Sequence, residues 1–339
     1  MADATVLPVG IEGAQYSRMS YLKNCFKVRW FPKIRLTYLK PRKLSVPKDL
    51  NGHERRRQAA HRLVEIMREL AFENAFREET IFEAVLHASA KHGPGKIVLE
   101  DATGARLSYR KLFMRAFVLG KFIEQDTSPN DRIGIMLPST VAAVVVMLAT
   151  LSKGRVAAMM NFTAGTKGLG IACETASVRV IYTSRKFIET AGLEAEVEAL
   201  KQRAKIIYLE DFRPKVSVAM KIGALCASVF PRRLCCGGRA QDPASEAVIL
   251  FTSGSEGIPK GVVLSHSNLL ANRAQIQSLI DLSHNDVVLN ILPIFHAFGL
   301  TGGIVLPLLD GVRTYFYPSP LHYRIIPELC YELGATCLF

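Results

Sequence analysis

Short apolar runs and helical patterns alternate along most of the chain. The helix signal is clearest after Ser108, which stands where an N-cap belongs; the apolar face that follows carries Leu112, Ala116, Leu119 and Ile123. The run 141–151 is apolar throughout and predicts a buried helix. Other runs have the length of buried strands, namely 96–99, 132–136, 178–183, 205–209 and 247–251. The alternation predicts an α/β fold, with sheets flanked by helices, from about residue 76 onward.

The first 75 residues have a different pattern. Residues 26–48 predict short strands broken by prolines, and residues 54–73 predict an amphipathic helix. The apolar arc of that helix is predicted to hold Ala60, Leu63, Val64, Met67, Leu70 and Ala71. We therefore expect a domain boundary near residue 75, between a domain at 1–75 and a second at 76–339.

The composition is that of a folded protein of about two domains, with 339 residues of which 49% are hydrophobic and 22% are charged. The formal net charge is +13, and residues 1–75 carry +8 of it. A basic block suggests a partner bearing phosphate or acidic groups: nucleic acid, anionic lipid or an acidic carrier protein. The alternative is a solvated basic face with no partner.

Neither the cysteines nor the apolar runs indicate a secreted or membrane-spanning protein. The seven cysteines form no C-x-x-C pair, which favours ordinary reduced thiols. The N-terminal residues lack the pattern of a signal peptide. Residues 287–309 contain no Asp, Glu, Lys or Arg, but their prolines, glycines, Asn290 and His296 favour a strand, a loop and a buried helix. We expect a cytoplasmic chain without a transmembrane span.

The candidate chemistry follows the strand predicted at 247–251, in the segment Thr252–Gly261. Its glycines, Gly254 and Gly257, let backbone N–H groups approach a ligand closely. Lys260 adds one compact positive charge. Hydroxyl donors come from Thr252, Ser253 and Ser255. Together these residues are suited to holding a polyphosphate.

Two other interpretations of this segment are possible in principle. It is not a Walker A motif, because Gly261 and a predicted strand follow Lys260 where Ser or Thr and a helix would stand. A glycine-rich β-hairpin without a ligand is the second, and the coincidence of hydroxyls, glycines and lysine argues against it.

The loop resembles the phosphate-binding signature of the adenylate-forming superfamily, whose members activate carboxylates with ATP. Residues 292–299 resemble the family's P-x-F-H segment, which lines the substrate pocket. The resemblance implies ATP and Mg²⁺ as cofactors, with Thr252–Gly257 closing over the β- and γ-phosphates and Lys260 neutralising them. It implies that His296 is catalytic and lies beside the acyl group and the α-phosphate. The alternative is a structural role, because a lone histidine in an apolar segment is more often a core residue. His266 is interpreted as a helix-start residue outside the site.

Residues 161–165 and 317–324 are similar to the synthetase half of bifunctional 2-acylglycerophosphoethanolamine acyltransferase/acyl-[acyl-carrier-protein] synthetases. Residues 6–73 resemble the end of the acyltransferase half. The implied fold is a partial adenylation domain preceded by the C-terminal tail of a lysophospholipid acyltransferase domain. No histidine is followed five residues later by Asp, so the acyltransferase motif is absent, as are the family's later Y-G-x-T-E, ribose-binding Asp and C-terminal Lys elements. We expect a fragment lacking both ends.

The implied activity is ATP-dependent activation of a fatty acid through an acyl-adenylate, followed by transfer to a carrier thiol and linked to phospholipid acyl turnover. The implied partners are a fatty acid, acyl carrier protein or CoA, and an anionic membrane surface reached through the basic block, with no nucleic acid. Peripheral association with the inner face of a membrane is the corresponding location. The alternatives are an inactive fragment with residual nucleotide binding, a lipid-surface acyltransferase remnant, and an acyl-CoA ligase.

Overall fold

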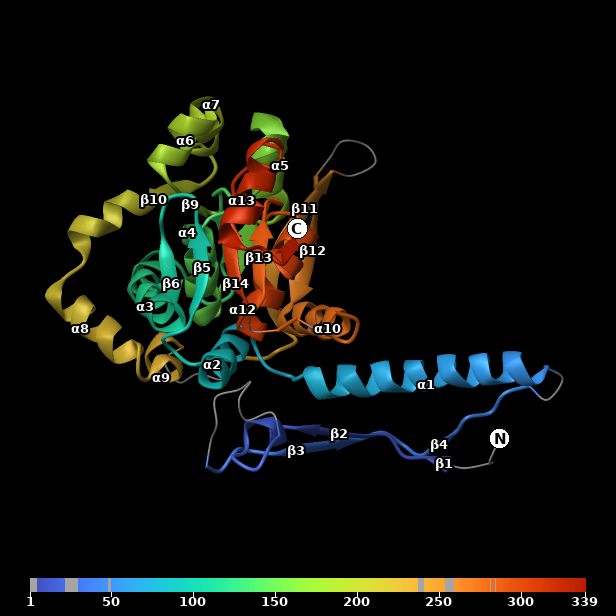
Figure 1. The fold of residues 1–339 in the computed structure, drawn as a ribbon. Coiled ribbons are helices and arrows are strands. Elements are labelled where there is room, and N and C mark those ends of the chain that lie inside the picture. The colour runs from blue at the N-terminus through green and yellow to red at the C-terminus, as the bar shows by residue number, and fades with distance from the viewer. Residues whose placement is uncertain are drawn as a thin grey trace. The chain divides into compact units, whose positions relative to one another are not determined.

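The chain forms two compact units (Figure 1). Unit 1 comprises residues 1–77 and 270–281, and unit 2 comprises residues 78–269 and 282–339. The structure is a computed structural model. It describes residues 5–21, 30–47, 50–236, 241–253, 259–280, 282–283 and 285–339.

Unit 2 contains a six-stranded sheet in which five strands run parallel and the edge strand β12 runs antiparallel to β11. The order is β10 (Lys205–Tyr208), β9 (Val180–Thr183), β7 (Arg132–Ile135), β8 (Val156–Met159), β11 (Glu246–Ser253) and β12 (Pro259–Ser265). The predicted strands at 132–136, 178–183, 205–209 and 247–251 all lie here. Their parallel course requires crossover connections, which the intervening helices provide.

A second sheet of five strands has four parallel strands and one antiparallel edge strand, β6. The order is β15 (Cys337–Leu338), β13 (Val287–Asn290), β14 (Arg313–Phe316), β5 (Ile97–Asp101) and β6 (Arg106–Ser108). After β13 the chain forms α11 (Ala297–Leu300), a buried π-helical turn at Thr301–Val305 and α12 (Leu306–Asp310). The prediction of a strand, a loop and a buried helix over 287–309 is thus confirmed. Within the described ranges, no helix is both long and apolar enough to span a membrane.

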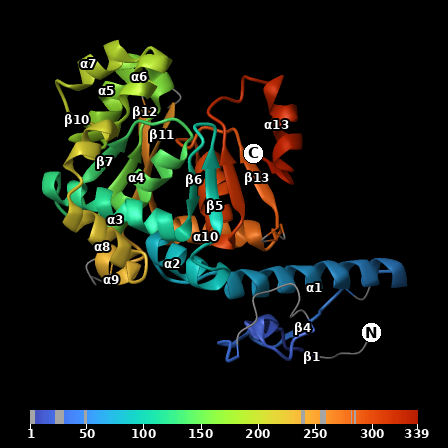
Figure 2. The same ribbon diagram turned by 60° about the vertical axis from the view of Figure 1, so that its left-hand side comes forward.

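Helix α4 (Val141–Ser152) contacts β7 and β8 of the first sheet and β5 of the second. All of its residues except Ala142 are buried, as expected for a helix that is apolar all round. The other face of the six-stranded sheet packs against α5 (Gly165–Thr175), α6 (Arg185–Ala191) and α7 (Glu194–Leu200) (Figure 2). The sequence between the strands predicted at 178–183 and 205–209 predicts one helix around 187–203. The structure divides this helix in two, because Gly192 adopts a left-handed conformation with φ of 64° and ends α6.

Side-chain caps begin several of the remaining helices of unit 2. Ser108 Oγ accepts a hydrogen bond from the Lys111 N–H, which confirms the predicted cap, and the predicted apolar face of that helix is buried. Thr80 and Glu83 form a capping box at the next helix upstream. The described helices not yet named are α2 (Ile81–His92), α3 (Tyr109–Asp126), α8 (Val218–Ala227), α9 (Pro231–Cys235), α13 (Ile325–Leu333) and the 3-10 segments η2 (Phe162–Ala164) and η3 (Leu209–Lys215). Helix α10 (His266–Gln277) begins in unit 2 and continues into unit 1.

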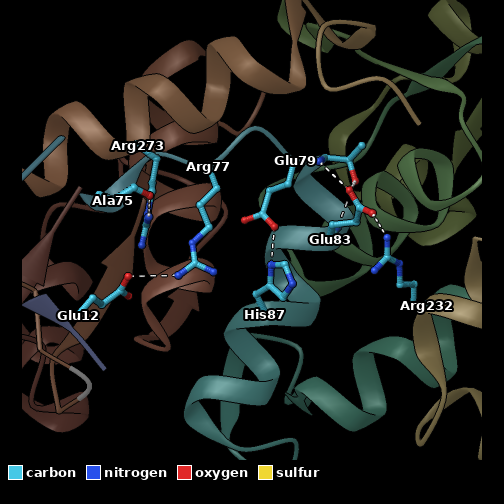
Figure 3. Close-up of polar contacts among 9 residues, drawn as sticks. Glu12, Ala75, Arg77, Glu79, Glu83, His87, Arg232 and Arg273 are labelled. Carbon is cyan, nitrogen blue, oxygen red and sulfur yellow. Dashed lines mark hydrogen bonds and ion pairs between the residues drawn. The ribbon is translucent and has the colours of Figure 1, made fainter. Parts of the chain in front are cut away.

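Unit 1 combines the long helix α1 (Gly52–Ala75) with two short antiparallel strand pairs and the 3-10 turn η1 (Ala14–Tyr16). The strand pairs are β1 (Thr5–Val6) with β4 (Arg42–Lys43), and β2 (Val9–Glu12) with β3 (Arg35–Tyr38). Arg77 Nη2 lies 3.2 Å from Glu12 Oε2, and Arg273 Nη1 donates to the Ala75 carbonyl at 3.3 Å (Figure 3). These contacts hold β2 and residues 270–281 near the end of α1.

The β2–β3 pair presents its apolar side chains outward. Val9 lies opposite Tyr38 and Ile11 lies opposite Leu36, and these four side chains are 48–73% exposed. The inward face carries Gly10, where a Cβ atom would lie only 2.1 Å from the Asn74 side chain of α1. The β2–β3 pair therefore packs against α1 through the face that holds its small and polar side chains.

The buried face of α1 differs in part from the predicted one. Leu70 is buried as expected, together with Ala59 and Ile66. In contrast, Leu63, Val64 and Met67 are 41–50% exposed. They border a shallow hollow of about 370 Å³ with Arg68 and Ser278. The predicted apolar arc is therefore mostly uncovered: Leu70 is buried, whereas Ala60, Leu63, Val64 and Met67 are exposed.

Residues 136–141, which connect β7 to α4, are held by side chains from both sheets. Thr183 Oγ1 donates to the Met136 carbonyl at 2.8 Å, and Ser139 Oγ donates to the Leu292 carbonyl at 2.9 Å. Asp101, buried at the end of β5, accepts from the Val141 N–H at 2.8 Å and so caps α4 from another strand.

We predict that Asp101→Ala lowers the free energy of unfolding by about 2–3 kcal/mol, because the buried Val141 N–H loses a charged acceptor. Urea denaturation measures this change. Asp131→Ala is the matched control: its carboxylate accepts from the Ser128 N–H at 2.7 Å in an exposed turn, and its loss is expected to cost under about 1 kcal/mol. Equal effects of the two substitutions would contradict the role given to Asp101.

His266, the first residue of α10, is 2% exposed, and its Nδ1 accepts a hydrogen bond from the Ile81 N–H at 3.2 Å. Burial lowers the pKa of His266 to about 4, so the ring is neutral near pH 7 and links the start of α10 to the start of α2. This agrees with its interpretation as a helix-start residue.

Because the folded-state pKa of His266 is depressed, the unfolded chain takes up this proton first as pH falls. Stability is therefore expected to decrease between about pH 6.5 and pH 4, by up to about 3 kcal/mol from this residue. In His266→Gln that portion of the pH dependence should disappear, as measured by urea denaturation at several pH values. His61→Gln, on an exposed position of α1, should retain it.

Candidate nucleotide-binding edge

The segments singled out in the sequence follow the carboxyl ends of parallel strands. The segment 161–165 follows β8, the segment 292–299 follows β13, and Thr252 and Ser253 end β11. In open α/β sheets, ligands bind beyond the carboxyl ends of the strands. The fold thus places these segments where a ligand site is expected.

Strands β11 and β12 form the two arms of a hairpin around the predicted phosphate-binding loop. Thr252 pairs with Lys260, and Ser253 pairs with Pro259. Cross-strand partners project from the same face of a ladder, so the Thr252 and Lys260 side chains lie on one face of the hairpin, and both are exposed. The loop residues Gly254, Ser255 and Gly257 lie outside the described residues.

The direction of these two side chains follows from the alternation along β11. Ile249 and Phe251 pack into the core formed with α5–α7. Thr252 therefore lies on the opposite face, which is the face that α4 covers farther down the sheet. Gly261, opposite Phe251, sits against the Ile249 side chain, where a Cβ would be 3.4 Å from Ile249 Cγ2. Lys260 is thus directed away from the α5 side.

The P-x-F-H segment is fixed by aromatic packing. Phe295 is buried, and its ring centroid lies 5.0 Å from that of Phe162, which lies 5.0 Å from that of Phe187. His296 follows at the N-cap position of α11, with its exposed ring 4.7 Å from the Phe295 ring. The structure therefore joins the 161–165 and 292–299 segments and leaves the imidazole accessible to a ligand.

Several positioning residues of this edge were not identified from the sequence. Asp101, Ser139 and Thr183 orient the 136–141 connection, and Phe162 and Phe187 support Phe295. A buried Asp directly after a strand was the available signal for Asp101. The other contacts depend on which strands become neighbours, and local patterns do not encode that.

A hollow of about 650 Å³ lies at the opposite, amino-terminal edge of the six-stranded sheet. Its lining includes the first residues of β7, β8, β9 and β11, namely Arg132, Val156, Val180 and Glu246. Arg132 and Glu246 of this lining form an ion pair at 2.9 Å. None of the predicted site residues lines this hollow.

The chain matches the family model described as AMP-binding enzyme over residues 86–339. Among curated proteins, it is 26% identical to the medium-chain fatty-acid–CoA ligase of Escherichia coli K12, covering 74% of this chain and 44% of that protein. It is also 26% identical to the long-chain-fatty-acid–AMP ligase FadD32 of Mycolicibacterium smegmatis, covering 70% of this chain and 36% of the relative. The chain spans less than half the length of these relatives.

Solved structures share the fold. A fatty acyl-adenylate ligase from L. pneumophila, in complex with acyl adenylate and pyrophosphate, superposes with a TM-score of 0.60 at 19% identity, over 76% of this chain and 44% of that one. ATP-bound MatB from Rhodopseudomonas palustris gives a TM-score of 0.58 at 25% identity, over 76% of this chain and 48% of that one. The predicted α/β adenylation fold is confirmed, and the family match over three quarters of the sequence establishes that this chain belongs to the AMP-binding enzyme family.

Proposed function

We propose that this chain carries the nucleotide-binding part of an enzyme that activates a fatty-acid carboxylate with ATP. The carboxylate attacks the α-phosphorus, an acyl-phosphate bond forms, and the bond to pyrophosphate breaks. The observation that carries the proposal is the β11–β12 hairpin, which sets Thr252 opposite Lys260 at the carboxyl edge of the sheet. Relatives named as fatty-acid–CoA and fatty-acid–AMP ligases support the class of substrate.

The roles of the residues follow from charge and position. Lys260 neutralises the terminal phosphates, and Thr252 donates a hydrogen bond to them, together with Ser253 and the loop residues Gly254, Ser255 and Gly257. Neutralising the leaving pyrophosphate lowers the barrier, because phosphoryl-type transfer depends on positioning and charge. His296 contacts the acyl and α-phosphate groups, where the new bond forms.

Mg²⁺ is a proposed cofactor whose protein ligands we leave unassigned. The described residues hold no cluster of three or more His, Cys, Asp or Glu side chains that could bind a metal ion. Mg²⁺ is commonly held by substrate phosphates with one or two carboxylates. It would supply charge neutralisation at the phosphates.

The acyl acceptor in this proposal is a phosphopantetheine thiol, the group shared by CoA and acyl carrier protein. The finer proposal is that of the bifunctional synthetase, in which the carrier accepts the acyl group and the product serves phospholipid acyl turnover. The basic charge of residues 1–75 supports contact with an anionic lipid surface or an acidic carrier. The outward apolar face of β2–β3 supports unit 1 as the margin of an acyltransferase domain. Assaying acyl transfer to CoA and, separately, to a carrier protein that bears free phosphopantetheine distinguishes the two acceptors.

We predict that Lys260→Ala weakens binding of ATP by about tenfold to a hundredfold, because a charge-assisted phosphate contact is lost. Titration calorimetry with the purified chain measures this effect. An acyl sulfamoyl adenosine, which lacks the β- and γ-phosphates, should bind the variant nearly as well as the native chain. Lys186→Ala, an exposed lysine of α6, is the charge-matched control. Unchanged ATP affinity in Lys260→Ala would remove this lysine from the site.

We predict the opposite pattern for His296→Ala. Affinity for the acyl sulfamoyl adenosine should fall by about tenfold, since the ligand loses a hydrogen-bonding partner beside the acyl linkage, and ATP affinity should change by less than about twofold. Competition binding of both ligands to one preparation measures the contrast. His322→Ala, a histidine bonded to Tyr317 at 2.8 Å, is the control. An equal loss of affinity for both ligands would show that His296 supports the folded structure and does not contact the acyl linkage.

A further inference from the structure

The segment from η3 to α9 carries an apolar stripe that the rest of unit 2 leaves uncovered. The side chains of the stripe are 60–71% exposed, and they are Val218, Ile222, Leu225 and Val229. Their spacing of four, three and four residues places them on one face of α8 and the turn that follows it. Figures 1 and 2 both show α8 along the outer side of the unit, beyond α3.

The opposite face of α8 is well packed. Ala224 and Ala227 are buried, and Gly223 lies against Phe117 of α3, where a Cβ would be 2.7 Å from the ring. Small residues thus fix the helix on α3 by close approach. The exposed stripe is the outer face of a docked helix.

Helix α9 is anchored as well. Arg232 Nη2 pairs with Glu83 Oε1 of α2 at 3.0 Å (Figure 3). Cys235 is fully buried, with its Sγ 3.8 Å from the Phe113 carbonyl. Helices α8 and α9 are therefore both held on unit 2, with the stripe facing outward.

Positive charge surrounds the stripe. Residues 212–236 contain no Asp or Glu, and their exposed basic residues are Arg213, Lys215, Lys221, Arg232 and Arg233. An apolar helix face bordered by Lys and Arg is the pattern of a helix that lies in the plane of a membrane interface. Two copies of this chain meeting at the stripe would bring like charges together, which disfavours self-association there.

We propose that α8 binds the surface of an anionic lipid bilayer, with the stripe among the acyl chains near the headgroups and the basic residues at the lipid phosphates. This surface is distinct from the basic block of residues 1–75 and from the nucleotide-binding edge. It goes beyond the proposed function and does not depend on it. Under the proposed function, a lipid surface is also where the water-insoluble fatty acid accumulates, so α8 would hold unit 2 close to its proposed substrate.

The test is flotation of the full chain with vesicles of phosphatidylcholine mixed with phosphatidylglycerol, and with vesicles of phosphatidylcholine alone. The native chain should float with the anionic vesicles and much less with the neutral ones, and raising the salt concentration should weaken binding. Ile222→Glu/Leu225→Glu should lower the partition coefficient by about tenfold or more. The matched control, Ile325→Glu/Tyr331→Glu, places the same charges at exposed apolar positions of α13.

The basic residues are tested separately. Lys215→Gln/Lys221→Gln/Arg233→Gln should lower partitioning to anionic vesicles by about a hundredfold at low salt. The control removes the same charge from exposed positions elsewhere in unit 2, as Lys167→Gln/Arg179→Gln/Lys186→Gln. It should bind within a few fold of the native chain.

Insertion is read directly from Cys226, which is exposed on α8. Burial raises the pKa of Cys173 to about 11 and of Cys235 to about 12, so both stay protonated and unreactive near pH 7. With the other accessible cysteines changed to serine, an environment-sensitive dye on Cys226 should shift to the blue on anionic vesicles.

Flotation of the α8 variants equal to that of the native chain, or no shift of the dye, would overturn the proposal and assign any membrane binding to residues 1–75. Failure of the native chain to float, combined with retention on an immobilised acidic protein, would also overturn it in favour of a protein partner.

Discussion

The connection from β7 to α4 fixes the two sheets of unit 2 relative to each other. Helix α4 fills the space between them with apolar side chains, and apolar contacts are largely non-directional. The relative orientation of the sheets is set by hydrogen bonds to residues 136–141. Thr183 of one sheet makes one of these bonds, and Asp101 and Leu292 of the other sheet make the rest. Each is short and at least partly buried, so its loss would leave a polar group without water. The candidate nucleotide-binding edge depends on this link, because its segments come from both sheets.

The α/β class and most elements of unit 2 could be predicted from the sequence because burial there follows the periodicity of the element. The apolar run 141–151 and the Ser108 cap are examples in which local chemistry and tertiary structure agree. Prediction was less complete around 187–203, where one glycine in a left-handed conformation divides a helix. It failed in part on α1, since periodicity identifies an apolar arc but not which part of that arc a neighbour covers.

The candidate site was predictable to a different extent. The hairpin that carries Thr252 and Lys260 follows from two apolar strands around a glycine-rich loop. The pairing of Phe162 with Phe295 does not, because about 130 residues separate them and β8 and β13 belong to different sheets, so only the packing of the two sheets brings these segments together. The sequence of residues 216–230 is helix-like, but the stripe on α8 could be recognised only once the structure showed that alanines and a glycine form the packed side.

The outward-facing apolar side chains of the β2–β3 pair have a practical consequence. In unit 1 an apolar row lies on the outer face of a two-stranded sheet, and within the described residues neither strand of that pair has a second partner. Such a surface is a template for strand addition by another molecule. The positive charge of the same region keeps copies apart, and dissolved ions screen that repulsion. We therefore expect this small region to limit the solubility of the protein, with precipitation favoured as ionic strength rises.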